Sequence, residues 1–242
     1  MPSDKPSAHK KPKIHKPILY QVFEALGDIF ERGYFADKVI EYRLKQKGSK
    51  WGSRDRRFFA EAVYDIVRWY RRLRVSLPEN LQGDYWALLK AWLILKDYEY
   101  PEMKEFPSFN QDTFKSKYSK PTQFADISSY PDWMVGRVCE ELGREKGEAV
   151  LQAMNQTAEI YMRCNFLNIE VEALSRLLDK EGIQNKIIDP VIGTLCLNQR
   201  KNVFVTSAFK KGFFEVQDYG SQQIVPLLEV AKKQRVLDFC AG

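Results

Sequence analysis

The sequence predicts a mainly α-helical domain followed by a small α/β (α+β) domain, and three observations lead to this prediction. Apolar residues recur at helical spacing through most of residues 18–97. Residues 98–130 are rich in proline and aromatic side chains and show no sustained period, as is typical of a connection. Beyond them, short apolar runs typical of strands alternate with helical segments, mainly within 131–230. The remaining parts are a proline- and lysine-rich flexible arm at 1–17 and a short final segment at 231–242.

The helical part begins at Ile18, and Gly33 is expected to stop its first helix. A second helix is expected to close at Gly48. For the third, Ser53 is the expected N-cap, with Asp55 in the first turn where the helix dipole favours an anion. A further helix is expected over residues 85–96.

The second part opens with two helices that should break near Gly143. Its later elements are expected in a fixed order along the chain: a strand over 159–167, a helix over 171–182, strands over 186–197 and 202–218, an amphipathic helix over 221–234, and a last strand over 236–239.

Composition excludes several classes of protein. Of the 242 residues, 44% are hydrophobic and 29% charged, which is typical of a folded soluble chain. No run approaches the ~20 apolar residues that span a bilayer, and the N-terminus lacks a secretory signal, so we expect a cytoplasmic protein with no membrane partner. The four cysteines are far apart and both histidines lie in the arm, so we expect neither a metal site nor a Ser-His-Asp or Cys-His centre.

The positive charge is concentrated in two segments. The net charge is +6, yet residues 1–20 carry a net +4 and residues 43–74 a net +8, so the rest of the chain is acidic. Such a distribution favours a polyanionic partner over general basicity.

Three stretches resemble the Sun/RsmB family of S-adenosylmethionine-dependent RNA 5-methylcytosine methyltransferases. They are "GFFEVQDYGSQQIVPLL" followed by "RVLDFCAG", "YPDWMVGRVCEELG" with "MNQTAEIYMRCN", and "WGSRDRRFFAEAVYDIVRWYRRL". The last is similar to the NusB-like RNA-binding extension of bacterial members. The chain departs from the family at residues 157–159, where a proline is usual.

The resemblance implies that the chain is the N-terminal part of such an enzyme, truncated inside its first cofactor motif. Val236–Phe239 would be the first strand of a Rossmann-like domain, and S-adenosylmethionine would be bound by Asp238, Cys240, Ala241 and Gly242. Both catalytic cysteines are expected beyond Gly242, so no catalytic residue is assigned here and the chain alone should be inactive. Cys240 belongs to the cofactor loop in this interpretation, and nothing nearby in the sequence activates it as a nucleophile.

The resemblance also places Gln217, Asp218 and Ser221 near the cofactor or a flipped base. Their alternative role is that of a turn and helix cap. Phosphate contacts are expected from the basic cluster, namely Lys50, Arg54, Arg56, Arg57, Arg68, Arg71, Arg72 and Arg74. Its alternative role is an ordinary solvated helix face with i,i+4 ion pairs.

The predicted function is therefore the RNA-binding N-terminal portion of a monomeric RNA cytosine-C5 methyltransferase, with ribosomal RNA (16S) as the expected partner. A stand-alone RNA-binding or assembly protein with NusB-like helices is the alternative from another class. A different nucleotide modification on the same scaffold also stays open, because fold does not fix chemistry.

Overall fold

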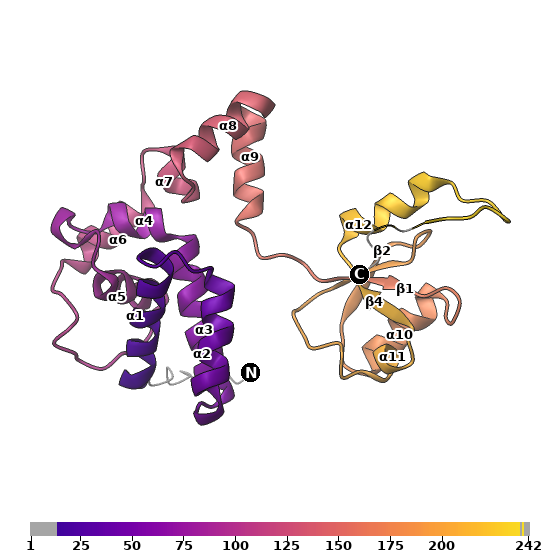
Figure 1. Ribbon diagram of the computed structural model, residues 1–242, viewed down its shortest axis with the longest axis horizontal. Helices are drawn as coiled ribbons and strands as arrows, with labels where there is room; N and C mark the ends of the chain where they lie inside the picture. The colour runs from indigo at the N-terminus through magenta and orange to yellow at the C-terminus, as the bar shows by residue number, and fades with distance from the viewer. Residues whose placement is uncertain (1–13, 238, 240–242) are drawn as a thin grey trace, which may run out of the picture. The chain divides into compact units, whose positions relative to one another are not determined.

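The computed structural model describes residues 14–237 and Phe239, and the chain divides into two compact units. Unit 1 ends at Gln156 and unit 2 begins at Thr157. Figure 1 labels most of the helices and strands of the two units. Residues 1–13, which make up most of the expected arm, lie outside the described part. The first helix begins at Lys16, two residues earlier than expected, because Pro17 suits the first turn of a helix.

Unit 1 is all-helical. Its elements are α1 (Lys16–Phe30), α2 (Ala36–Lys47), η1 (Gly48–Lys50), α3 (Ser53–Arg68), α4 (Tyr70–Ser76), η2 (Glu79–Leu81), α5 (Tyr85–Leu95), α6 (Gln111–Ser119), α7 (Phe124–Ser128), α8 (Asp132–Leu142) and α9 (Arg144–Met154).

The core of unit 1 forms where α1, α3 and α5 contact one another. Leu19, Leu26, Phe59 and Ile66 are fully buried there, and α5 is buried on nearly every side from Ala87 to Ile94. Burying one such side chain stabilises the fold by about 1.5–3 kcal/mol. The continuous apolar run of α5 is thus explained by its central position.

The expected connection at 98–130 contains two helices, α6 and α7, that the sequence did not predict. Asn110 caps α6 by accepting a hydrogen bond from the Thr113 amide at 2.9 Å. Aromatic side chains fix the segment to the core of unit 1; they are Tyr98, Tyr100, Phe106, Phe109, Phe114 and Tyr118. Sequence periodicity missed these helices because each is short and few of its residues are buried.

Helices α8 and α9 form a hairpin that breaks at Gly143, where φ is +79°. They lie in unit 1, whereas the sequence placed the domain boundary before them at 130/131. Polar contacts attach the hairpin to its neighbours: Asp132 forms an ion pair with Arg71 at 3.0 Å, and the Asn155 side-chain amide donates to the Ser128 carbonyl at 2.7 Å.

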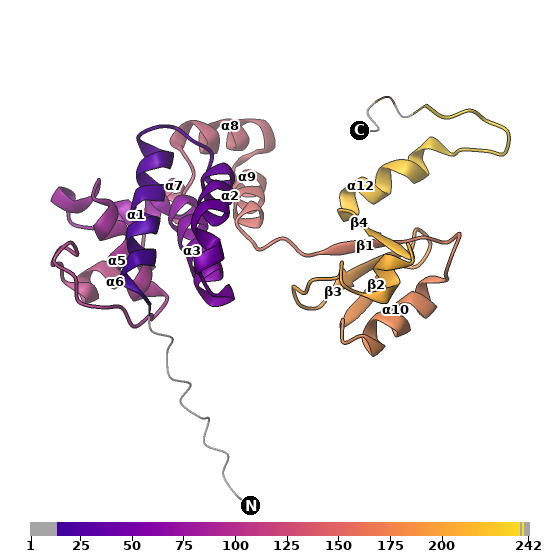
Figure 2. The same cartoon turned by 60° about the horizontal axis from the view of Figure 1, so that its bottom comes forward.

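Unit 2 is an α+β unit around an antiparallel sheet of order β2-β3-β1-β4. Its elements are β1 (Tyr161–Cys164), α10 (Val171–Lys180), β2 (Asn185–Asp189), β3 (Thr194–Leu197), α11 (Ser207–Lys210), β4 (Phe214–Val216), α12 (Tyr219–Ile224) and η3 (Val225–Leu228). Met162 on β1 pairs with Leu195 on β3 and with Val216 on β4. Helix α10 buries Leu174 and Leu178 and contacts β2 and β3 (Figure 2).

The C-terminal third differs from expectation in three places. The region 202–218 contains one short strand, β4, preceded by α11, whose cap Thr206 accepts from the Phe209 amide at 3.2 Å. The helix expected over 221–234 ends at Ile224 and passes into a 3₁₀ turn at 225–228, which contains Pro226. Of the strand expected over 236–239, the described residues Val236, Leu237 and Phe239 form no strand, because no neighbouring strand pairs with their backbone groups; Asp238 lies outside the described residues.

Candidate nucleic-acid interface

Helix α3 separates an apolar face from a cationic one. Phe58, Ala62 and Val63 are buried, while Arg54 and Arg57 are exposed. The helix starts at Ser53 with Gly52 at the N-cap position, so the expected cap by Ser53 is wrong. Asp55 does lie in the first turn, as predicted.

An arginine stripe runs along the exposed face of α3 and consists of Arg54, Arg57 and Arg68. At 1.5 Å per residue, these residues extend over about 21 Å of helix. Within the described part of the chain, Arg54 and Arg57 form no hydrogen bond or ion pair, and Arg68 donates only to the Asn155 carbonyl at 3.2 Å. Their guanidinium groups are therefore open to an external anion.

Two of the three acidic residues on α3 pair with a residue at the end of another helix rather than with this stripe. Asp65 and Glu61 lie 2.8 and 3.7 Å from the Lys96 amino group at the end of α5. Partial burial favours the neutral amine, but the hydrogen bond from Lys96 to Asp65 and the two negative charges outweigh it and raise the pKa of Lys96. The i,i+4 pairs that an ordinary solvated face would use are not formed on this helix.

Arg71 and Arg72 point into unit 1. Arg71 contacts Asp126 at 2.6 Å and Asp132 at 3.0 Å, and its hydrogen bond lowers the pKa of Asp132. Arg72 donates twice to the Tyr118 carbonyl, at 2.8 and 3.0 Å, and its guanidinium lies 4.4 Å from the centre of the Tyr118 ring. Both side chains hold the 118–132 segment against α4.

The remaining three residues of the predicted basic cluster also differ from one another in their surroundings. Arg56 donates to the carbonyls of Gly48 and Trp51, at 3.2 and 2.7 Å, and so closes the turn before α3. Lys50 and Arg74 are exposed. The open members of the predicted set are thus Lys50, Arg54, Arg57, Arg68 and Arg74.

Aromatic side chains beside this set pack against the core of unit 1. The Trp51 ring lies 5.3 Å from that of Phe59, and the Tyr70 ring stacks on Phe30 at 4.2 Å.

The turn before α12 is built around a buried glutamine. Asp218 caps the helix by accepting from the Gly220 amide at 3.0 Å, and Ser221 is exposed. Gln222 is buried; it accepts from the Thr194 hydroxyl at 2.6 Å and donates to the Gln217 carbonyl at 2.8 Å. Sequence reasoning did not select Gln222, since its burial depends on a partner on β3, 28 residues away.

Two hollows of unit 2 adjoin this turn and share Arg163, Cys164 and Asn165. The one of about 300 Å³ is bordered by Gln222, and the one of about 410 Å³ by Gln217. Burial raises the pKa of the Cys164 thiol to about 11, so this cysteine is not poised as a nucleophile. The predicted cofactor residues Asp238, Cys240, Ala241 and Gly242 lie outside the described residues.

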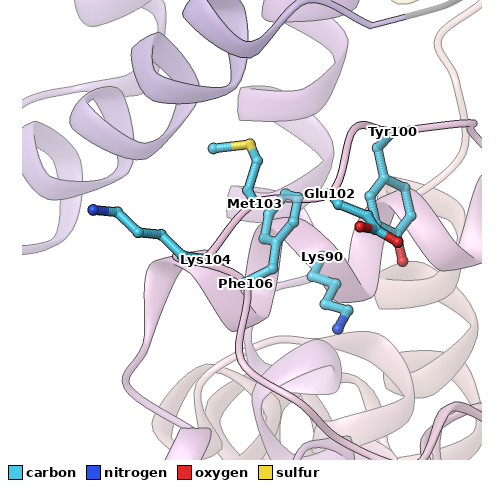
Figure 3. A pocket seen from close by; sticks show the side chains of 6 residues that line it. All are labelled: Lys90, Tyr100, Glu102, Met103, Lys104 and Phe106. Carbon is cyan, nitrogen blue, oxygen red and sulfur yellow. The ribbon is translucent and has the colours of Figure 1, made fainter.

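A larger hollow on unit 1, of about 640 Å³, is lined by Lys90, Tyr100, Glu102, Met103, Lys104 and Phe106 (Figure 3). The amino groups of Lys90 and Lys104 point in different directions, so the polar groups do not converge on one point (Figure 3). The Lys90 amine is occupied by the Pro107 carbonyl at 2.8 Å. We therefore assign no ligand to this hollow.

The described residues contain neither a metal-binding cluster nor a membrane-spanning helix. Across 14–237 and Phe239, no group of three or more His, Cys, Asp or Glu side chains is placed to hold a metal ion. None of the helices within the same ranges has the length and apolar character needed to cross a membrane.

Comparison with known proteins shows what parts of this chain are similar to. The family model for the ferredoxin-like domain of RsmF/B-like methyltransferases matches residues 130–204, which include β1, α10, β2 and β3. Over these residues the chain is similar to RsmF/B-like methyltransferases.

The relatives are ribosomal RNA small subunit methyltransferases B. That of Proteus mirabilis is 29% identical over 113 residues, covering 47% of this chain and 26% of the relative. That of Xylella fastidiosa is 29% identical over 115 residues, covering 48% of this chain and 27% of the relative. The chain thus matches about a quarter of the length of these relatives. The crystal structure of PH0851 has a similar fold, with a TM-score of 0.51 and 18% identity over 88% of this chain and 55% of that one.

Proposed function

We propose that this chain is the RNA-binding N-terminal portion of an S-adenosylmethionine-dependent methyltransferase that modifies C5 of a cytosine in small-subunit ribosomal RNA. The relatives supply the reaction class by their names. The residues of this chain supply the RNA-binding role.

The observation that carries the RNA-binding role is the open arginine stripe on α3. Arg54, Arg57 and Arg68 present unpaired or nearly unpaired guanidinium groups, while Lys96 neutralises the carboxylates between them. A planar guanidinium donates two parallel hydrogen bonds to a phosphate, which makes arginine well suited to RNA backbones.

For unit 2 we propose a position beside the reacting nucleotide, with Gln217, Asp218 and Ser221 near the cofactor or the base. This role accords with the two hollows beside the turn. When bound, S-adenosylmethionine supplies the methyl group. The chain's own contribution would be to grip phosphates through unit 1 and to hold the 217–222 turn rigid through Gln222, whose side chain bridges Thr194 and Gln217.

The test has two parts. Filter binding of the 242-residue chain to transcribed segments of small-subunit ribosomal RNA should show an affinity that falls steeply as salt rises. The full-length protein should transfer a labelled methyl group from S-adenosylmethionine to one segment, with the modified cytosine located by resistance to bisulfite.

Each part refutes a different portion of the proposal. Absence of RNA binding at low salt would remove the role of unit 1. RNA binding without methyl transfer by the full-length protein would favour a non-catalytic RNA-binding protein. Transfer to a position other than cytosine C5 would place a different modification on the same scaffold.

A further inference from the structure

Three exposed aromatic side chains gather around the turn between α1 and α2. Tyr34, Phe35 and Tyr42 line one hollow of about 490 Å³ together with Arg32 and Lys38. We call this feature the aromatic hollow. It is separate in residue content from the arginine stripe, and it lies within the size range of small-ligand sites.

These rings are unusually exposed. Tyr34 and Tyr42 are each 59% exposed and Phe35 is 78% exposed. Within the described part of the chain none of the three contacts another aromatic ring, although most rings of unit 1 pack in pairs. Exposing large rings forgoes the stabilisation that burial would give, so their faces are open for a ligand.

The turn fixes the position of the rings. Gly33 adopts a φ of +72°, which brings the Tyr34 amide to the Asp28 carbonyl at 3.2 Å. Phe35 then occupies the N-cap position of α2. Tyr42 lies two turns further along that helix, and its hydroxyl accepts from Gln46 at 2.6 Å. The three rings thus sit on a short, ordered frame.

The rim of the hollow is cationic. Its carboxylate, Asp28, is paired with both Arg32, at 2.9 Å, and Arg43. The Lys38 side chain is 71% exposed, and its amino group lies as far as 3.9 Å from the Glu41 carboxylate, so this ion pair is weak. Residues 31–50 together carry six Lys/Arg against three Asp/Glu. As an occupant of the hollow, an anionic ligand is therefore favoured over a neutral or acidic protein surface that offers similar apolar groups.

We propose that the aromatic hollow binds unpaired RNA nucleotides, with bases stacked on Tyr34, Phe35 or Tyr42 and phosphates held by Arg32 and Lys38. This inference rests on the proposed RNA-binding function and deepens it. The chain would read a junction, with paired RNA on the arginine stripe and a single-stranded segment at the aromatic hollow. Open aromatic faces combined with cations constitute the chemistry by which proteins bind single strands.

The experiment compares two RNA probes with the full chain. A fluorescein-labelled 12-mer oligouridine represents unpaired RNA, and a 12-base-pair duplex represents paired RNA. We expect Tyr34→Ala with Phe35→Ala to weaken oligouridine binding by about 5- to 150-fold, the effect of removing base–aromatic stacking. Duplex binding should change less than about twofold. Trp133→Ala, at a residue 74% exposed on α8, is the control and should alter neither affinity.

Two further variants separate stacking from simple apolar contact. Phe35→Tyr retains an aromatic face and should bind oligouridine like the original chain, whereas Phe35→Leu should bind it several-fold more weakly. Ultraviolet crosslinking of 5-iodouridine in the 12-mer should attach RNA to Tyr34, Phe35 or Tyr42, as identified by mass spectrometry.

The possible failures can be told apart. If the original chain binds neither the oligouridine nor the duplex, the proposed RNA-binding function itself is refuted. Two results would overturn the stacking site alone, provided that the duplex still binds normally. In one, the double alanine variant binds oligouridine as tightly as the original chain. In the other, the Phe35→Leu and Phe35→Tyr variants bind oligouridine with equal affinity. A dimer of the original chain that the double variant dissociates without any change in RNA affinity would also overturn it.

Discussion

The number of phosphates that the arginine stripe contacts can be read from salt dependence. The perturbation is the triple variant Arg54→Gln, Arg57→Gln and Arg68→Gln, which removes charge while keeping polar side chains of similar reach. None of the three holds the fold through a charged partner within the described residues, and only Arg68 donates to a backbone carbonyl. The variant should therefore remain folded, which circular dichroism can verify.

The magnitude follows from the count of open cations. If Lys50, Arg54, Arg57, Arg68 and Arg74 each contact one phosphate of a structured RNA, the logarithm of the association constant should fall with the logarithm of salt at a slope of about −4.5. The triple variant leaves two of these contacts and a slope of about −1.8. Between 50 and 200 mM salt, affinity should then fall about 500-fold for the original chain and about 12-fold for the variant.

The assay is fluorescence anisotropy of a labelled RNA hairpin at four or five salt concentrations. The control is Lys115→Gln, Lys117→Gln and Lys120→Gln, which makes the same change in net charge on exposed residues of α6 or just beyond it. Its slope should match that of the original chain. An unchanged slope in the arginine variant would mean that the stripe is an ordinary solvated face, and equal reductions in both variants would mean that only net charge matters.

The remaining predictions concern the fold around the site. Arg72→Gln should lower the free energy of unfolding by about 2–3 kcal/mol in urea titrations, because the Tyr118 carbonyl loses a charged donor; a change below about 0.5 kcal/mol would contradict the structural role of Arg72. Gly147→Ala should cost about 1–3 kcal/mol and lower the melting temperature, since its Cβ would lie 2.9 Å from the Cys139 backbone; an unchanged melting temperature would show that the α8–α9 hairpin packs differently. At pH 8, iodoacetamide should modify Cys139 well before Cys164, because burial raises the pKa of Cys164 to about 11 and leaves little reactive thiolate; equal rates by mass spectrometry would refute this.

The sequence predicted those parts of the fold whose signals are local. The long helices of unit 1 and the helix at 171–180 follow from the spacing of their apolar residues, and Gly48 and Gly143 end helices where expected. The α+β character of unit 2 followed from short apolar runs around one helix. These features depend on residues close together in the chain, so a single sequence contains enough information to find them.

Prediction was weaker where an element needs partners from elsewhere. The helices at 111–119 and 124–128 are held by aromatic contacts and arginine hydrogen bonds to the core of unit 1, which no local pattern reveals. Likewise, the run at 236–239 resembles a strand in sequence, yet its described residues Val236, Leu237 and Phe239 form none without a neighbour to pair with their backbone.

For the candidate interface, composition alone determined that residues 43–74 carry a surplus of cations and that an anionic partner is favoured. Only the tertiary structure decided which cations are open. Arg68 and Arg72 are four residues apart, yet Arg68 is exposed while Arg72 is bound to a carbonyl 46 residues away. The reason is physical: helical periodicity fixes the direction in which a side chain points, but its partner is set by whichever distant segment packs there.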